Sequence, residues 1–145
     1  MRQRSDSLAV ATRRGLTQIT PANARNMTAQ WVYRVNKATH LECVPLVKDG
    51  VMYVTSANEC YALDAGSGRQ IWHYQRARTR GLVGNAAGGV NRGVASAGDR
   101  VFMVTDHAHL IALNRSTGAL LWETEMADWR QNYNGTGAPL VVGNL

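Results

Sequence analysis

The stretch Ala62-Leu-Asp-Ala-Gly-Ser-Gly-Arg-Gln-Ile-Trp72 occurs a second time, fifty residues later, as Ala112-Leu-Asn-Arg-Ser-Thr-Gly-Ala-Leu-Leu-Trp122. Each copy is typical of a strand that ends in Ala-Leu, a tight turn closed by Gly68 or Gly118, and a second strand that ends in tryptophan. Glycine suits the end of the turn because it adopts a positive φ without a Cβ clash. One turn and one tryptophan per repeat of this length indicate an all-β fold made of β-propeller blades.

The repeat extends beyond the quoted stretch, because an alternating hairpin precedes each copy. The first full unit begins at about residue 43, with strands predicted at 46–47, 51–55, 59–63 and 69–74. In the second unit, the strands are predicted at 94–95, 101–105, 109–113 and 119–124. Each full unit is therefore expected to form one four-stranded blade.

Partial units flank the two full ones. Residues 28–35 alternate well enough for a strand, and Trp31-Val-Tyr33 matches Trp72-His-Tyr74, so we expect the last strand of an earlier unit there. Residues 139–145 repeat 45–51, which predicts the start of a third unit. A ring of four to eight blades cannot close from so few units. We therefore expect residues 27–145 to be a partial β-propeller truncated at its C-terminus, behind a polar lead-in at residues 1–26.

The composition is that of an ordinary folded domain, with 45% hydrophobic and 18% charged residues. The net charge is +6, but residues 1–26 contain five arginines and one aspartate and so carry four of these charges. The rest of the chain is nearly balanced, so we do not expect a nucleic-acid partner. Arg76, Arg78 and Arg80 are interpreted as a solvated loop. No apolar run is long enough to span a membrane, and no hydrophobic export signal follows the basic N-terminus.

The two cysteines and the paired histidines do not predict a metal site. Cys43 and Cys60 form no CxxC motif, and two buried free thiols are favoured over a disulfide, which remains an alternative in an oxidising compartment. His107 and His109 share one face by strand alternation, and a surface or inter-blade packing role is favoured over a metal pair. The four tryptophans are interpreted as inter-blade packing residues, and they are Trp31, Trp72, Trp122 and Trp129.

A polar residue stands just before the first strand of three successive units. These residues are Glu42, Arg92 and Thr136. In a propeller such points converge on one end of the central axis, where ligands bind. Arg92 can present a rigid charged fork to an anionic or carbonyl-bearing ligand, although it can equally cap loop carbonyls. The glycine-rich segment 76–93 that leads to it is either a flexible connection or part of this site, and its spacing does not match a Rossmann phosphate loop.

The Ala-Leu-Asp-x-x-x-Gly-x-x-x-Trp unit resembles the tryptophan-docking motif of the eight-bladed quinoprotein alcohol dehydrogenases, which use pyrroloquinoline quinone (PQQ). Residues 16–23, followed by Trp31-Val-Tyr33, are similar to that family's N-terminal segment, and residues 90–93 and 136–139 are similar to its cofactor-proximal motifs. The resemblance covers about residues 15–145. It implies hydride transfer from an alcohol or a related substrate to PQQ.

By this resemblance, Glu42, Arg92 and Thr136 contact the cofactor. Arg92 would bond the quinone oxygens and stabilise negative charge as hydride arrives, Glu42 would accept from the cofactor's rim, and Thr136 would donate to a carboxylate. The family also implies a calcium or lanthanide ion, an electron acceptor such as a cytochrome c or a quinone, and a periplasmic location. The metal ligands and the aspartate base of the family lie further along than this chain reaches. We therefore expect no catalytic residue and no metal ligand here, and no activity from the chain alone.

One departure from the family leaves the subclass open. Many alcohol-oxidising members have adjacent cysteines that form a disulfide ring over the cofactor, where this chain has Ala86 and Ala87. The alternative function is a non-enzymatic PQQ-like repeat propeller that serves as a protein-binding scaffold. Such scaffolds keep the turn and the tryptophan without needing Glu42, Arg92 and Thr136, so the polar residues favour the enzyme.

Overall fold

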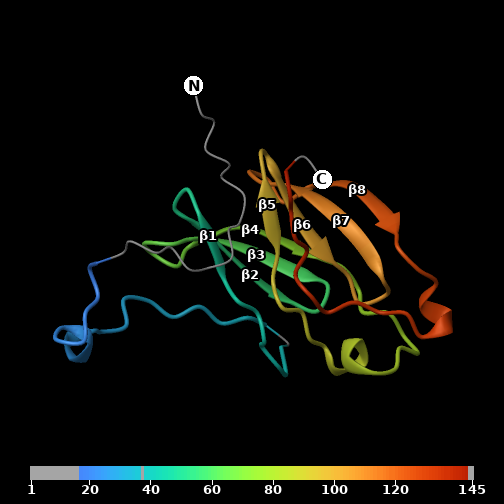
Figure 1. Ribbon diagram of the computed structural model, residues 1–145, viewed down its shortest axis with the longest axis horizontal. Helices are drawn as coiled ribbons and strands as arrows, with labels where there is room; N and C mark the ends of the chain where they lie inside the picture. Colours follow the sequence, from blue (N-terminus) through green and yellow to red (C-terminus); the bar gives the residue numbers. More distant parts are fainter. Residues whose placement is uncertain (1–16, 37, 144–145) are drawn as a thin grey trace.

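The computed structural model describes residues 17–36 and 38–143, which form two four-stranded antiparallel sheets (Figure 1). In each sheet the strands are hydrogen-bonded in sequence order, as in a propeller blade. The strands of the first sheet are β1 (Leu46–Lys48), β2 (Val51–Ser56), β3 (Glu59–Asp64) and β4 (Gln70–Gln75). Those of the second are β5 (Ala95–Ala97), β6 (Arg100–Val104), β7 (His109–Asn114) and β8 (Leu120–Glu125). The predicted all-β, incomplete propeller is confirmed.

The sequence repeat is reproduced in the details of both sheets. The ladder shifts register between Ala62 and Leu63 in the first sheet and between Ala112 and Leu113 in the second. In both following turns an Asx side chain accepts from backbone N–H groups two or three residues on, with Asp64 in the first sheet and Asn114 in the second. The repeated stretch therefore specifies a bulge and a turn as well as two strands.

Trp72 joins the two sheets at the turn of the second repeat. Its Nε1 donates to the carbonyl oxygen of Arg115 at 2.9 Å, and its ring covers Gly118. Gly118 has φ +74°, and a Cβ there would lie 2.6 Å from a ring atom, so only glycine allows this contact. Trp31 makes the same contact with Gly68 in the first sheet and donates to Ala65. The predicted inter-blade packing is confirmed for Trp72, and Trp31 packs in the same way from the N-terminal arm.

The other two tryptophans do not pack between the sheets. Trp122 lies near Phe102 and is 36% exposed, because no other sheet in the described part of the chain covers that face. Trp129 lies in the short 3₁₀-helix η3 (Trp129–Gln131), where the guanidinium of Arg130 stacks on its ring at 4.9 Å. The inter-blade prediction is therefore wrong for Trp129, which is placed outside both sheets.

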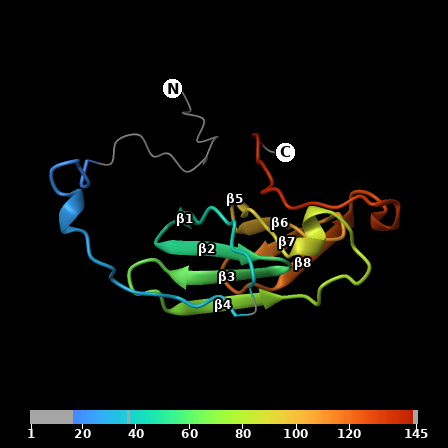
Figure 2. The ribbon, with the colours of Figure 1, turned by 90° about the horizontal axis from the view of Figure 1, so that it is seen from below.

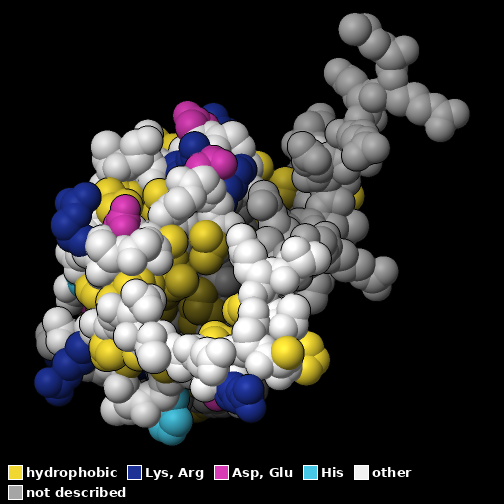
Figure 3. Space-filling view, turned by 90° about the vertical axis from the view of Figure 1, so that its left-hand side faces the viewer, with side chains coloured by type: hydrophobic (Ala, Val, Ile, Leu, Met, Phe, Trp, Pro, Cys, Tyr) yellow, Lys and Arg dark blue, Asp and Glu magenta, His cyan; other side chains and the backbone are white. Residues whose placement is uncertain are grey.

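The main core lies between the two sheets, which lie next to each other when seen from below (Figure 2). Its largest fully buried members come from both sheets, and they are Tyr53, Met103, Ile111 and Leu113. Seen from the side that carries the N-terminal arm, hydrophobic side chains line a hollow bordered by other groups (Figure 3). The sheets thus bury one shared interface and leave other apolar surface exposed, as expected for blades without all their neighbours.

Residues 28–35 are not the strand that was predicted. This segment is an extended arm beside the first sheet, and none of the described strands pairs with it. Its side chains still alternate, because Trp31, Tyr33 and Val35 are half-buried against the first sheet. Alternation reports burial on one side, whereas a strand also needs a hydrogen-bonded partner.

The chain ends agree only in part with the predictions. Residues 139–143 form no strand, and 144–145 lie outside the described residues, as do residues 1–16 of the predicted lead-in. Residues 17–26 are exposed and include the 3₁₀-helix η1 (Ala24–Asn26). Cys43 and Cys60 are free as predicted, although Cys43 is only half-buried. Among the described residues, no helix has the length and apolar character needed to cross a membrane.

Asp106 is a buried carboxylate that holds the two sheets together. Its side chain is 1% exposed, and it accepts hydrogen bonds from Arg78 Nε, Thr79 N and Thr79 Oγ1 at 2.9–3.0 Å. Its backbone N–H donates to Asn58 Oδ1 at 2.9 Å, across the boundary between the sheets. Arg78 also donates to the carbonyls of Ala86 and Ala87. Arg78 lies in a loop and is 41% exposed, as predicted, but its guanidinium also has the structural role of binding the buried Asp106.

We expect Asp106→Asn to destabilise the protein at pH 7 by about 1–3 kcal/mol, because it weakens a buried, charge-assisted hydrogen-bond network. Burial raises the pKa of Asp106, but hydrogen bonds with Asn58, Thr79 and Arg78 outweigh it, so the pKa lies below its ordinary value. A carboxyl with a depressed folded-state pKa stabilises the fold above its unfolded pKa of about 3.9, and this contribution is lost as pH falls through the folded pKa.

Urea unfolding of the Asp106→Asn variant at pH 7 and at pH 3 measures this effect. The difference in the free energy of unfolding between the variant and the unsubstituted protein should be smaller at pH 3 than at pH 7. Asp99→Asn is the matched control, because Asp99 is 80% exposed and pairs only loosely with Arg100, at 3.7 Å. A stability gap for Asp106→Asn that is the same at both pH values would contradict the assignment.

Candidate functional site

Three chain segments run side by side just ahead of β1, ahead of β5 and near the C-terminal end (Figure 1). The backbone N–H of Arg92 donates to the carbonyl of Thr136 at 2.8 Å, and that of Val44 donates to the carbonyl of Arg92 at 3.3 Å. Arg92 is thus in the middle segment. The point before each unit's first strand, which sequence reasoning singled out, is where the three segments meet.

The three predicted site residues are in direct contact. Arg92 Nη2 donates to Glu42 Oε2 at 2.9 Å, and Arg92 Nη1 donates to Thr136 Oγ1. The side chains of Arg92 and Glu42 are 44% and 46% exposed, whereas Thr136 is nearly buried. The structure therefore brings Glu42, Arg92 and Thr136 together as one polar cluster, open to solvent on the side of Arg92 and Glu42.

Two neighbours of Arg92 hold its segment in place. Gly93 has φ +128°, and a Cβ there would lie 3.1 Å from the carbonyl oxygen of Val44, so the close approach of the segments requires glycine. Asn91 is buried; its Oδ1 accepts from Gly93 N and its Nδ2 donates to Val104 O, both at 2.9 Å. Asn91 thus anchors the arginine segment to β6. Asn91 lies within the 90–93 motif, and an Asn side chain that accepts from the backbone N–H two residues on is a known turn signal that could have identified this role.

The cluster can bind an anionic or carbonyl-bearing group. The two hydrogen bonds described for the Arg92 guanidinium go to side chains rather than to loop carbonyls. An arginine has five N–H donors, so others remain for a ligand. Thr136 Oγ1 accepts from Arg92, which leaves its own proton free to donate. Glu42 offsets the charge of Arg92 and orients its fork.

The glycine-rich connection is ordered around a short helix. Segment 76–93 contains the 3₁₀-helix η2 (Asn85–Gly88), which includes Ala86 and Ala87. Arg78 ties this helix to Asp106 by donating to both alanine carbonyls and to the carboxylate. These hydrogen bonds do not favour the interpretation as a merely flexible connection, and the two alanines lie a few residues ahead of Arg92 in the chain.

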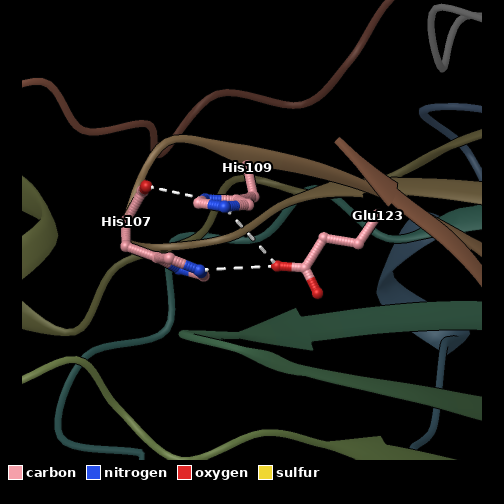
Figure 4. Close-up of side chains that lie close together, drawn as sticks. All are labelled: His107, His109 and Glu123. Atoms are coloured by element: carbon pink, nitrogen blue, oxygen red, sulfur yellow. Dashed lines mark hydrogen bonds and ion pairs between the residues drawn. The ribbon is translucent and has the colours of Figure 1, made fainter. Parts of the chain in front are cut away.

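A second polar cluster lies between the sheets and contains His107, His109 and Glu123 (Figure 4). Arg76, just after β4 of the first sheet, pairs with Glu123 Oε1. Arg76 is therefore more than the solvated loop residue that was predicted, whereas Arg80 is exposed as predicted. The histidine rings stack with centroids 4.0 Å apart. Burial is the main cause that lowers the pKa of His107, with Arg76 and His109 adding to it. The two histidines stack on each other within the second sheet, so the preference for inter-blade packing over a metal pair stays a prediction. Strand alternation did not indicate Glu123, because it lies on a different strand.

Comparisons with known proteins agree with this architecture. The family model described as "Glucose/ethanol/alcohol dehydrogenase, beta-propeller domain", labelled PQQ, matches residues 12–135. The chain is 37% identical over 134 residues to quinohemoprotein alcohol dehydrogenase ADH IIB of Pseudomonas putida, covering 88% of this chain and 19% of the relative. It is 38% identical over 130 residues to 1-butanol dehydrogenase (cytochrome c) of Thauera butanivorans, covering 88% of this chain and 19% of the relative.

A solved structure described as a europium-containing methanol dehydrogenase has a similar fold. It superimposes with a TM-score of 0.75 at 33% identity, covering 89% of this chain and 23% of the neighbour. The chain thus spans about a fifth of the length of the curated relatives it matches. Because the family model covers most of the chain and the two sheets superimpose on such a propeller, this protein belongs to the PQQ family of glucose/ethanol/alcohol dehydrogenase β-propeller domains.

Proposed function

We propose that this chain supplies part of the PQQ-binding site of a quinoprotein dehydrogenase that oxidises alcohols or related substrates. The observation that carries the proposal is the contact of Glu42, Arg92 and Thr136, which come from three successive units and share two hydrogen bonds. Family membership supports PQQ as the ligand class. The scaffold alternative gains no support from these contacts, because a scaffold does not need a polar cluster at this point.

The donor set of this cluster fits PQQ. PQQ is a flat ortho-quinone with three carboxylates, so its rim needs cationic and neutral donors. The spare N–H groups of Arg92 would bind carboxylate or quinone oxygens through charge-assisted bonds, and the Thr136 hydroxyl would donate to a carboxylate. Glu42 would hold the guanidinium in place and accept from the cofactor's rim. When bound, PQQ supplies the redox chemistry by taking up hydride from the alcohol carbon.

The residues of this chain would bind and orient the cofactor. Arg92 would place positive charge where negative charge develops, which is the most effective kind of electrostatic stabilisation in an enzyme. Asn91 and Gly93 would act as positioning residues, because they fix the segment that carries Arg92. No residue of this chain is assigned to proton abstraction or to the metal of that site.

The other components of the activity are proposed from the relatives. We propose a calcium or lanthanide ion beside the cofactor, bound by residues outside this chain; one structural neighbour is described as containing europium. We propose a cytochrome c or a quinone as electron acceptor, since one relative is named a cytochrome c-dependent 1-butanol dehydrogenase. A periplasmic location is proposed for the same family reason.

Reconstitution of the intact protein that contains this chain tests the proposed function. The apoprotein would be mixed with PQQ and Ca²⁺ or a lanthanide, and alcohol-dependent reduction of an artificial dye would be followed. We expect turnover only when both PQQ and the metal are added. Dye reduction that does not depend on PQQ, or PQQ binding without any alcohol-dependent turnover, would contradict the proposal.

A further inference from the structure

Three potential metal-ligand atoms face one another in the second sheet (Figure 4). His107 Nε2 lies 3.5 Å from Glu123 Oε1, and His109 Nε2 lies 3.9 Å from the same oxygen. One ligand atom from each of the three residues lies within 4.8 Å of the others. Two imidazoles and one carboxylate are a common ligand set for zinc and other divalent transition metals.

The backbone brings the two histidines together. Ala108, between them, has φ +60°, a left-handed conformation that is uncommon for a residue other than glycine. This turn stacks the two rings with their planes 24° apart. Strand alternation predicted one shared face, but His107 lies in the turn before β7, so the Ala108 conformation and not the strand explains the pairing. Glu123 completes the cluster from the neighbouring strand β8.

Hydrogen bonds at the far side of each ring orient the ligand atoms. His109 Nδ1 lies 3.0 Å from the carbonyl oxygen of His107, so this nitrogen carries the proton and donates it. Thr105 Oγ1 donates to the carbonyl of His109 and therefore accepts from His107 Nδ1, at 3.1 Å. In the neutral form, both Nε2 atoms then keep a lone pair. Histidines that bind metals are held in the same way, by an acceptor at the other ring nitrogen.

The ligand side of His107 lacks a hydrogen-bond partner. His107 is 5% exposed, and its Nε2 is buried without one. Buried polar atoms are normally satisfied, so an exception needs an explanation. Here the lone pairs of two imidazole Nε2 atoms face a carboxylate oxygen. All three atoms are acceptors, so a metal cation between them would bind all three. Arg76 already supplies one positive charge to this same oxygen, Glu123 Oε1, but it does not hydrogen-bond His107 Nε2.

We propose that His107 Nε2, His109 Nε2 and Glu123 Oε1 bind a divalent transition-metal ion, with Zn²⁺ as the best match to the ligand set. Zinc takes nitrogen and oxygen ligands at about 2.0–2.2 Å in tetrahedral geometry. The two Nε2 atoms, at 3.5 and 3.9 Å from Glu123 Oε1, therefore need to move only a little closer to it to share one ion. The His109 ring must tilt toward Glu123, and Arg76 must yield part of its contact. Both side chains have room, with 18% and 33% exposure. The site is separate from the Glu42, Arg92 and Thr136 cluster and ties the turn before β7 to β8.

Isothermal titration calorimetry of the unsubstituted chain with Zn²⁺, without chelating tags or buffers, tests the site. We expect one saturable site per chain. His107→Asn and Glu123→Gln should each weaken binding by more than about tenfold, since losing even an outer partner of a metal ligand costs about 10–100-fold. Arg76→Gln should tighten binding by about two- to fivefold, because it removes a competing ion pair of about 0.4–1 kcal/mol.

The control is His40→Asn, which changes an exposed histidine outside the cluster and should leave binding unchanged. Glu123→Gln is on the exposed strand β8, and circular dichroism will show whether it and the other variants stay folded. A second measurement is the Tm, which Zn²⁺ should raise in the unsubstituted chain but not in Glu123→Gln. Absence of saturable binding, binding that persists in Glu123→Gln, or binding lost in His40→Asn would each overturn the proposal.

Discussion

Replacing Trp72 by alanine will lower the free energy of unfolding by about 3–5 kcal/mol, the range found for buried tryptophans. Trp72 is 7% exposed and belongs to the core between the sheets. Its ring fills the space above Gly118, and its indole N–H donates to the carbonyl of Arg115 at 2.9 Å. The substitution removes this packing and leaves that carbonyl without its indole donor. Urea unfolding followed by far-UV circular dichroism measures the loss.

Trp122→Ala is the matched control, because Trp122 occupies the same position of the next repeat but is 36% exposed. Its cost should be about 1 kcal/mol or less, as for surface substitutions. Gly118→Ala tests the same contact from the other side and should also destabilise, since its Cβ would meet the Trp72 ring at 2.6 Å. Equal losses for Trp72→Ala and Trp122→Ala would show that the contact with Gly118 does not hold the sheets together.

Replacing Arg92 by alanine in the intact protein will weaken PQQ binding by about 10–100-fold, because charge-assisted hydrogen bonds contribute about 1.5–3 kcal/mol. The fold should be nearly unaffected, since the Arg92 side chain is 44% exposed and its backbone hydrogen bonds remain. Turnover should fall with affinity, and Arg92→Lys should give an intermediate loss because lysine keeps the charge but not the planar fork. Absorbance titration of the apoprotein with PQQ measures the affinity.

Arg100→Ala is the control for a general loss of positive charge. Arg100 is 52% exposed and lies on β6, paired with Asp99 rather than with the polar cluster. This variant should bind PQQ as tightly as the unsubstituted protein. Unchanged PQQ binding by Arg92→Ala would remove Arg92 from the site, and an equal loss in Arg100→Ala would reduce its role to nonspecific attraction.

Most of the fold was predictable from local sequence signals. All eight predicted strands of the two full units appear within one or two residues of their expected bounds, because alternation and turn residues act over a few positions. The arm at residues 28–35 shows where this reasoning fails: its alternation is real, but no strand pairs with it. Pairing depends on a partner distant in sequence, which periodicity does not report.

The candidate site was predictable to the same extent. Glu42, Arg92 and Thr136 were selected because they hold equivalent positions in a repeat, and repetition in sequence becomes proximity around a propeller axis. Asn91, which anchors that segment to β6, acts through a single bond to Val104 that no spacing rule indicates.

The strands and turns of each blade follow from the amino-acid sequence, because alternation, the Asx side chain and the turn glycine act over a few neighbouring residues. Which charges meet across the boundary between the sheets depends on the tertiary packing alone. Arg78 with Asp106, and Arg76 with Glu123, are joined over 28 and 47 residues of chain, respectively. These contacts depend on how two separately specified sheets pack, and the shared core sets that geometry through the shapes of many side chains at once.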